Sequence, residues 1–167
     1  IIPSQRFLIG RMLAPIPETY QGQIVELGAG NGALTLKLAE RCPGARIFAC
    51  EINSTLAYDN RCKLMQYGID GRVKVLADSA ENVLSEMIRK NIKADYIISG
   101  IPLGNLGREQ TLALLDKIGC VLRQDGMYIQ FQHSLLDYQK MRAKFSVVHT
   151  ILVLLNFPPA VIYYARR

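Results

Sequence analysis

The stretch Gln23–Gly32, QIVELGAGNG, decides the fold. It opens with a short apolar run that encloses Glu26, and glycines follow at positions 28, 30 and 32. The next residues, ALTLKLA over 33–39, have the spacing of a helix. The pattern predicts a buried strand, a tight glycine turn and the start of a helix. Glycine permits positive φ and lets a ligand approach the main chain without meeting a Cβ, and the amides at a helix start point into the same space.

A second feature indicates what the glycine turn binds. Glu51 ends the next apolar run, Arg46–Cys50, about 20 residues further on, where a carboxylate can accept hydrogen bonds from the hydroxyls of a ribose. A nucleotide-like cofactor is therefore the expected occupant of the turn. Two alternatives stay open at this point. Gly28, Gly30 and Ala33 also fit the looser dinucleotide fingerprint G-x-G-x-x-G/A of NAD-binding proteins, and a glycine turn after a strand can be purely structural.

Length and composition describe an ordinary globular chain. Its 167 residues suffice for a sizeable core, and we expect a single domain over 1–167. Half of the residues are hydrophobic and a fifth are charged, which excludes a disordered chain. The net charge of +6, spread along the chain, suits nucleic acid or an anionic membrane surface, and an ordinary solvated surface equally well. The chain opens at Ile1 without a methionine, so we expect further residues upstream.

The cysteines and the most apolar stretch bear on the cellular compartment. The four cysteines show neither a CxxC pair nor zinc spacing, so we expect reduced thiols, no metal site and a cytoplasmic protein. We find no pattern of a signal peptide. The most apolar stretch, 147–165, is interrupted by His149, Asn156 and two prolines, which favours two strands and a turn over a membrane span.

Apolar runs and helical patterns alternate along the chain. Strands are predicted at 24–27, 46–50, 73–76, 96–99, 127–132, 147–155 and 161–164, and helices at 4–14, 32–41, 54–67, 79–88, 108–122 and 135–144. Alternation through five strands predicts a parallel sheet with helices on both faces. The last two strands are joined by the short segment 156–160, which cannot hold a crossover helix, so the last strand must run antiparallel.

A mostly parallel seven-stranded sheet with a terminal antiparallel strand resembles the Rossmann-like α/β fold of the class I S-adenosylmethionine-dependent methyltransferases. VELGAGNG, over 25–32, is similar to the first motif of that family. Glu51 matches its ribose-binding acid, and Asp78, in LADSA over 76–80, matches the loop position that reaches the adenine. The resemblance implies a methyltransferase with S-adenosyl-L-methionine as its cofactor. It disfavours NAD, because a dehydrogenase would normally add a substrate domain for which no chain remains.

The same resemblance implies a set of residues that contact the cofactor. The set comprises Ser4 and Phe7 of the first helix together with Glu26, Gly28, Ala29, Gly30, Gly32, Glu51, Ile52, Asp78, Ser79, Ala80 and Ser99. The first helix is included because it matches a segment that covers the cofactor in the related enzymes.

The closer resemblance is to bacterial phospholipid N-methyltransferases, a group related to ribosomal-RNA adenine dimethyltransferases. It rests on PSQRFL over 3–8, SGIPL over 99–103, GMYIQF over 126–131 and NFPPA over 156–160. It implies a phosphatidylethanolamine-type lipid as the methyl acceptor, bound by Gly100, Ile101, Pro102, Leu103 and Asn156. We further expect a monomer that is peripherally associated with the inner face of the cell membrane, with nucleic acid as the less favoured partner.

The exit of the fourth strand distinguishes the two related groups. Enzymes that methylate the amino group of a nucleobase carry an Asn or Asp, a Pro and an aromatic residue there, which orient the amine and stack on the base. The matching positions here are Gly100, Pro102 and Leu103, which suit a slender amine on an apolar stem. The alternatives are ribosomal-RNA adenine N6-dimethylation, methylation of a small amine, and a non-catalytic module that binds S-adenosylmethionine. A further alternative is that Ile101 and Pro102 merely end the strand.

The expected chemistry requires a neutral amine. A lipid primary amine titrates near about 10, so it arrives protonated and must lose a proton. His133, at the end of the fifth strand, is the predicted proton acceptor, and an ordinary polar residue at the rim is the alternative. Arg6 and Arg11 are expected to meet anionic headgroups, at about 1 kcal/mol each near such a surface.

Overall fold

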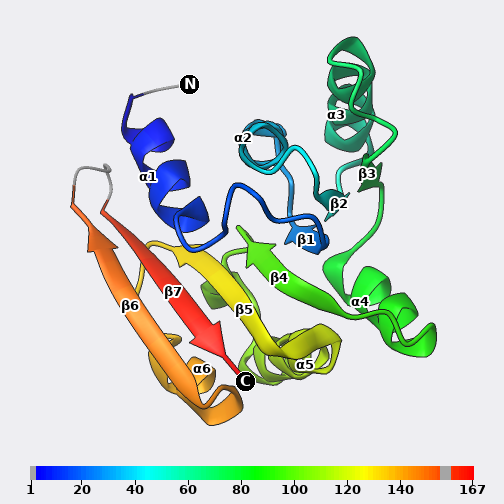
Figure 1. Cartoon of the computed structure of the whole chain (residues 1–167). Coiled ribbons are helices and arrows are strands. Elements are labelled where there is room, and N and C mark those ends of the chain that lie inside the picture. The colour runs from blue at the N-terminus through cyan, green and yellow to red at the C-terminus, as the bar shows by residue number, and fades with distance from the viewer. Residues whose placement is uncertain (1–2, 155–158) are drawn as a thin grey trace.

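The computed structural model describes residues 3–154 and 159–167, and its strands form a seven-stranded sheet in the order β3-β2-β1-β4-β5-β7-β6 (Figure 1). The strands are β1 (Gln23–Leu27), β2 (Arg46–Cys50), β3 (Val73–Leu76), β4 (Ala94–Ser99), β5 (Leu122–Gln132), β6 (Val147–Val153) and β7 (Ala160–Arg166). The first five strands pair in parallel, whereas β7 runs antiparallel to both of its neighbours, β5 and β6. This sheet confirms the predicted fold class and the antiparallel last strand.

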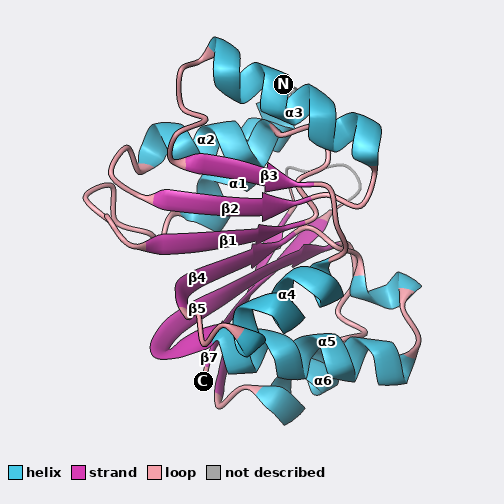
Figure 2. Cartoon of the chain, turned by 90° about the vertical axis from the view of Figure 1, so that its right-hand side faces the viewer, coloured by secondary structure: helices cyan, strands magenta, loops and turns pink. Residues whose placement is uncertain are grey.

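Helices cover both faces of the sheet (Figure 2). They are α1 (Pro3–Leu13), α2 (Ala33–Arg41), α3 (Ser54–Gln66), α4 (Ala80–Arg89), α5 (Arg108–Val121) and α6 (Tyr138–Lys144), with a short 3-10 turn, η1 (Leu103–Asn105). The first three pack on one face and the last three on the other, so the sheet separates two apolar cores, one around Leu38 and one around Leu84 and Leu114. In the described part of the chain no helix has both the length and the apolar character needed to cross a membrane.

Local sequence sets several element boundaries. β1 is buried at every position but its first, because strands pair with it on both sides and helices cover both faces. Asn53 begins α3, where its side chain accepts from the amides of Thr55 and Leu56. Ser79 begins α4, where its hydroxyl accepts from the Asn82 amide. These caps are the Asn and Ser residues that helix starts favour, and Ser79 caps α4 as the sequence predicts.

β5 is longer than the sequence predicts. It begins at Leu122, directly after α5, and not at 127, because Leu122 pairs with Ala94 of β4 ahead of a register shift. Gly126 lies close to this irregularity, where a Cβ would come within 2.8 Å of the Asp95 carbonyl oxygen. Gly126, which precedes the predicted start of the strand at 127, therefore lies inside β5 and permits close approach of two backbones there.

α6 is shorter than the sequence predicts. It begins at Tyr138 and not at 135. The Ser134 hydroxyl accepts from the Leu136 amide at 3.1 Å, which keeps the preceding residues in a turn. As a result, the leucines that were expected to start the helix lie in the connection between β5 and α6.

The carboxyl ends of β1 to β5 lie at one edge of the sheet, which is where ligands bind in open α/β sheets. The glycine turn follows β1, Glu51 follows β2, Asp78 comes just after β3, and the loop 100–103 follows β4. β6 ends at the same edge. It runs parallel to β5, because both strands are antiparallel to β7, which lies between them. The residues that are predicted to bind the methyl donor and the methyl acceptor therefore lie at one edge of the sheet.

Candidate active site

The glycine turn after β1 has the backbone conformation that the sequence predicts. Gly28, Gly30 and Gly32 have φ values of 78°, 54° and 80°, a region that favours glycine. The amides of Gly28 and Ala29 donate to the carbonyl oxygen of Cys50, at 3.0 and 2.9 Å, and hold the turn against the end of β2. A Cβ at Gly30 would meet no atom within 4 Å, so the middle of the turn faces open space.

Glu51 fixes the turn from the end of β2. Its carboxylate is buried, and Oε2 accepts from the Gly30 amide at 2.8 Å while Oε1 accepts from the Asn53 amide at 2.9 Å. Hydrogen bonds of an ionised carboxylate to backbone amides are stronger than neutral ones. Each carboxylate oxygen has further acceptor capacity, so Glu51 can hold the turn and accept from a ribose hydroxyl at the same time.

Two side chains of α3 hold the same turn, and sequence reasoning missed both. Asn60 is buried and donates from Nδ2 to the Gly30 carbonyl oxygen at 2.8 Å, and Lys63 donates from Nζ to the Asn31 carbonyl oxygen at 2.9 Å. A Cβ at Gly32 would clash with the Asn60 amide oxygen, so the third glycine makes room for this side chain. The spacing of three residues puts Asn60 and Lys63 on one helix face, which was the available signal.

Glu26 lies beneath the turn, within the sheet. Its side chain is 1 % exposed, and Oε2 accepts from the Thr35 hydroxyl at 2.6 Å. Burial raises the pKa of Glu26 to about 7; the Thr35 hydrogen bond opposes this shift and the charge of Glu51 adds to it. Oε1 has no hydrogen-bond partner among the described residues. Burial therefore favours the protonated, neutral form of Glu26 in the folded chain.

Asp78 lies just after β3, where the sequence predicts an adenine contact. Its exposed carboxylate accepts through Oδ1 from the Ser79 amide at 2.7 Å and from Asn82 Nδ2 at 2.8 Å. The start of α4 therefore orients this carboxylate, and its acceptor capacity suffices for an amino group as well. Ile52, directly after Glu51, is 77 % exposed and offers an apolar surface to a ring.

The loop after β4 touches the glycine turn. The Gly100 amide donates to the Leu27 carbonyl oxygen at 3.1 Å and so continues the pairing of β4 with β1. Ser99 is buried, and its hydroxyl accepts from the Ile101 amide at 3.2 Å. Cγ1 of Ile101 lies 2.9 Å from the position that a Cβ on Gly28 would take. The predicted cofactor and acceptor segments are therefore in contact through Gly28 and Ile101.

Leu103 departs from the prediction that it lines an acceptor site. Because the chain turns into η1 at this residue, the Leu103 side chain is fully buried in the core on the α5 side of the sheet. Its backbone has a structural role, since the carbonyl oxygen accepts from the Thr111 hydroxyl at 3.3 Å. Pro102 is exposed and Ile101 and Gly100 are half-buried, so these three residues form the accessible part of the loop.

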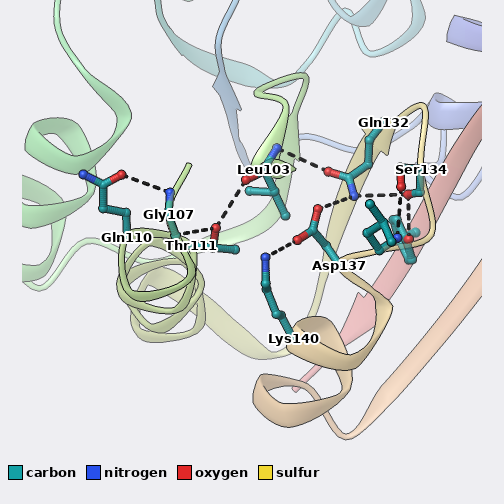
Figure 3. Close-up of polar contacts among 10 residues, drawn as sticks. Leu103, Gly107, Gln110, Thr111, Gln132, Ser134, Asp137 and Lys140 are labelled. Carbon is teal, nitrogen blue, oxygen red and sulfur yellow. Dashed lines mark hydrogen bonds and ion pairs between the residues drawn. The ribbon is translucent and has the colours of Figure 1, made fainter. Parts of the chain in front are cut away.

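Two glutamines of β5 hold the loop after β4 from the neighbouring strand, and Figure 3 shows the contact of Gln132 with Leu103. Gln130 donates from Nε2 to the Ile101 carbonyl oxygen at 2.8 Å, and Oε1 of Gln132 accepts from the Leu103 amide at 3.3 Å. Both glutamines are buried. Sequence reasoning missed them, although polar residues at alternate positions of an apolar strand, MYIQFQ over 127–132, indicate side chains that share one face.

The connection between β5 and α6 belongs to the same network (Figure 3). Gln132 donates from Nε2 to Oδ2 of the buried Asp137 at 3.0 Å, and Lys140 Nζ contacts Oδ1 of Asp137 at 2.5 Å. Tyr163, on β7, donates its hydroxyl to the Ser134 carbonyl oxygen at 3.0 Å, and burial raises the pKa of Tyr163 to about 12. This connection is therefore tied to both β5 and β7.

His133 lies one residue past β5, at the rim where the sequence places it. Its ring is exposed, packs edge-on against Phe131 with centroids 5.0 Å apart, and brings Nδ1 to 3.0 Å from the Pro159 carbonyl oxygen. Because a carbonyl oxygen only accepts, this contact assigns the hydrogen of the neutral ring to Nδ1 and leaves Nε2 as an acceptor. The role of His133 as proton acceptor stays a prediction.

The other predicted residues are placed in part. Phe7, on α1, is 41 % exposed, and the Arg11 guanidinium lies 5.4 Å from its ring centroid. Ala80 is buried at the start of α4. Ser4 lies within α1, and its side chain is not described. Asn156 lies outside the described residues.

Comparison with known proteins extends these observations. Residues 24–126 match the methyltransferase domain family. The chain is 26 % identical to the ornithine lipid N-methyltransferase of Singulisphaera acidiphila, over 99 % of this chain and 86 % of that protein. It is 30 % identical to ribosomal RNA small subunit methyltransferase C of Salmonella choleraesuis, over 54 % of this chain and 24 % of that protein. It is 28 % identical to the tRNA1(Val) (adenine(37)-N6)-methyltransferase of Pedobacter heparinus, over 63 % of this chain and 49 % of that protein.

Solved structures share the fold. The precorrin-6y C5,15-methyltransferase of Geobacter metallireducens superimposes with a TM-score of 0.75 at 17 % identity, over 96 % of this chain and 88 % of that one. The magnesium protoporphyrin IX methyltransferase of Synechocystis, solved with bound S-adenosylmethionine, gives 0.74 at 16 % identity, over 98 % of this chain and 79 % of that one.

The site also fits the cofactor on its own chemistry. The open middle of the turn at Gly30 admits a ligand to the main chain. Glu51 and Asp78 have acceptor capacity left for the ribose hydroxyls and the adenine amino group that the sequence predicts there, and these contacts stay predictions. Within residues 3–154 and 159–167 no group of three or more metal-ligating side chains gathers. The chain belongs to the methyltransferase domain family, in the class I S-adenosylmethionine-dependent enzymes, and S-adenosylmethionine is its cofactor.

Proposed function

We propose that the chain methylates the primary amine of a membrane lipid of the phosphatidylethanolamine type, as a monomer at the inner surface of the cell membrane. One observation carries this proposal: the accessible part of the loop after β4 consists of Gly100, Ile101 and Pro102. These residues carry no amide, carboxylate or aromatic ring with which to orient and stack a nucleobase. A slender amine on an apolar stem suits this surface.

The chemistry depends mainly on alignment. S-adenosylmethionine, when bound, supplies an electrophilic methyl group on a positively charged sulfur. The chain has to present a neutral amine in line with that group, in a site that excludes water. The contact between Gly28 and Ile101 brings the donor turn and the acceptor loop together, and Gln130 and Gln132 hold the loop in place.

His133 is the proposed acceptor for the proton that the amine must lose. The contact of Nδ1 with the Pro159 carbonyl oxygen orients the ring and leaves Nε2 as the acceptor. The exposure of the ring lets it pass the proton on to water. Replacement by asparagine would keep a polar side chain but remove the titratable nitrogen.

The similarity to the ornithine lipid N-methyltransferase supports a lipid acceptor, because it extends over 99 % of this chain. That protein acts, by its name, on an ornithine lipid. A lipid with an ornithine headgroup therefore belongs beside phosphatidylethanolamine in the test of this chain.

N6-methylation of adenine in RNA is the second candidate. The similarities to the ribosomal RNA and tRNA1(Val) enzymes support it, over 54 % and 63 % of this chain. This chain covers only 24 % and 49 % of those proteins. The missing orienting side chain and stacking ring at the exit of β4 favour the lipid.

One assay separates the two candidates. The purified chain is incubated with methyl-labelled S-adenosylmethionine and, in parallel, with vesicles that contain phosphatidylethanolamine, vesicles that contain ornithine lipid, and bacterial ribosomal RNA. Label in a lipid fraction would support the proposal, and label in RNA alone would contradict it. Glu51→Ala, which removes the acceptor of the Gly30 amide, is the inactive control, and Glu40→Ala, at an exposed position of α2, is the matched active one.

A further inference from the structure

An exposed apolar patch, formed by Leu135, Leu136 and Leu152, lies at the same edge of the sheet as the candidate active site. Leu135 and Leu136, between β5 and α6, are 50 % and 85 % exposed, and Leu152, near the end of β6, is 54 % exposed. All three line one groove of about 820 Å³. Single exposed leucines need no explanation, but apolar side chains that adjoin one another mark an interaction surface.

Cations flank this leucine patch. Arg108, Lys140 and Lys144 line a second groove, which shares Leu136 with the first. The two lysines each pair with an aspartate of the chain, whereas Arg108 has no ion-pair partner among the described residues. The chain as a whole carries a net charge of +6. Apolar side chains beside cations are the combination that binds an anionic bilayer surface.

Gln132, whose contacts Figure 3 shows, connects the leucine patch to the acceptor loop. Nε2 of Gln132 donates to the Ser134 carbonyl oxygen at 3.3 Å and to Asp137, which directly follows Leu136. Oε1 of the same side chain accepts from the Leu103 amide. One buried glutamine therefore connects the leucines to the loop after β4, so docking of the patch sets the position of the acceptor site.

We propose that the leucine patch is the part of the molecule that enters the membrane, where it inserts between the headgroups of a bilayer that contains anionic lipid. Arg108 then lies beside the inserted leucines, within reach of lipid phosphates. The amine headgroup then reaches the acceptor loop while the lipid that carries it remains in the bilayer. The role that we give to this docking rests on the proposed lipid substrate. The test of docking does not, because vesicle binding is measured without methyl transfer.

Tryptophan fluorescence tests the insertion directly, because the chain contains no tryptophan. Leu136→Trp places a reporter in the patch, and Met65→Trp places one at a 66 % exposed position of α3 as the matched control. Vesicles of phosphatidylethanolamine and phosphatidylglycerol in equal parts are added without S-adenosylmethionine. We expect the emission of Leu136→Trp to shift to the blue and to be quenched by brominated acyl chains, while Met65→Trp changes in neither respect.

Two outcomes of this measurement would overturn the proposal. One is an emission of Leu136→Trp that does not respond to vesicles, or that responds no more than Met65→Trp. The other is a blue shift that depends on protein concentration and needs no vesicles, which would assign the patch to contact with a second copy of the chain.

A double variant, Leu135→Ser/Leu136→Ser, separates docking from catalysis. Sedimentation should show vesicle binding weakened about tenfold, because apolar surface no longer leaves water, while Met65→Ser binds as the unmodified chain does. Calorimetry should show unchanged affinity for S-adenosylmethionine. Methylation of vesicle lipid should fall more than methylation of a dispersed short-chain lipid. Unchanged vesicle binding would refute the docking surface, whereas normal docking with no methylation of either lipid would refute the proposed substrate alone.

Discussion

The two halves of the candidate active site are held in place by different means. The donor half, around Gly28–Gly32, is held from two elements: the end of β2 accepts from its amides, and side chains of α3 donate to its carbonyl oxygens. The acceptor half, the loop 100–103, is fixed by side chains of β5, Gln130 and Gln132. The difference indicates that the donor half is a feature of the fold, whereas the acceptor half can change with a few side chains.

The largest effect is expected beneath the donor half, at Glu26. Because burial raises its pKa to about 7, the folded protein retains a proton there that the unfolded chain releases around its usual pKa of 4.5. Stability should therefore be greatest below the lower value, fall by about 3 kcal/mol as the pH rises to the upper one, and stay level above it. Urea unfolding at a series of pH values measures this slope. Glu26→Gln, which has a similar shape but does not titrate, should lose most of it, and a slope that persists in the variant would refute the assignment.

The second effect concerns the affinity of the donor half for S-adenosylmethionine. Glu51→Ala leaves the Gly30 and Asn53 amides without their carboxylate acceptor and removes the predicted ribose contact. Affinity for S-adenosylmethionine should fall roughly hundredfold, as expected for the loss of charge-assisted hydrogen bonds. Calorimetry measures it, with Glu40→Ala as the control that should bind normally. Equal affinity of the two variants for S-adenosylmethionine would contradict the assignment of Glu51 to the cofactor-binding half.

The third effect should be confined to the acceptor half. Gln132→Ala leaves the Leu103 amide and Asp137 without their shared partner. We expect kcat to fall about tenfold because the loop is less well positioned, and the affinity for S-adenosylmethionine to stay within about twofold. Gln66→Ala, at an exposed position of α3, is the control for a lost glutamine. A parallel loss of cofactor affinity in Gln132→Ala would show that the two halves are not held independently.

The smallest effect contrasts two glycines outside and inside the donor half. Gly10 lies within α1, and a Cβ there would meet nothing within 4 Å, so Gly10→Ala should stabilise the protein by about 0.5–1 kcal/mol. Gly32→Ala should destabilise it, because φ is 80° and the new Cβ would clash with Asn60. Thermal unfolding of the two variants checks the opposite signs. Stabilisation by Gly32→Ala would contradict the rigid donor half.

Those parts of the fold that depend on local sequence could be predicted. The bounds of β2 and β3 follow from short apolar runs, and the helix start at Ser79 follows from its capping hydroxyl. The glycine turn was predictable because its positive φ values restrict the residue type at each position. The donor half of the site could therefore be located before its structure was known.

The acceptor half depends on residues far apart in the chain, which local patterns do not reveal. The early start of β5 depends on the pairing of Leu122 with Ala94, and the burial of Leu103 depends on η1. The support from Gln132 depends on a partner 29 residues away. In the same way, nothing local shows that Asn60 of α3 reaches the glycine turn. Sequence reasoning found the acceptor segment but not what holds it.

The close approach of Ile101 to Gly28 connects the loop that we propose binds the amine with the turn that is predicted to bind the methyl donor. The isoleucine occupies the volume that any side chain at position 28 would need. A smaller residue at 101 would widen the route for a bulkier amine, and it would also leave the donor turn without lateral support. A single substitution at 101 should therefore alter both amine selectivity and the affinity for S-adenosylmethionine, and a second substitution in the other loop would be needed to restore the affinity.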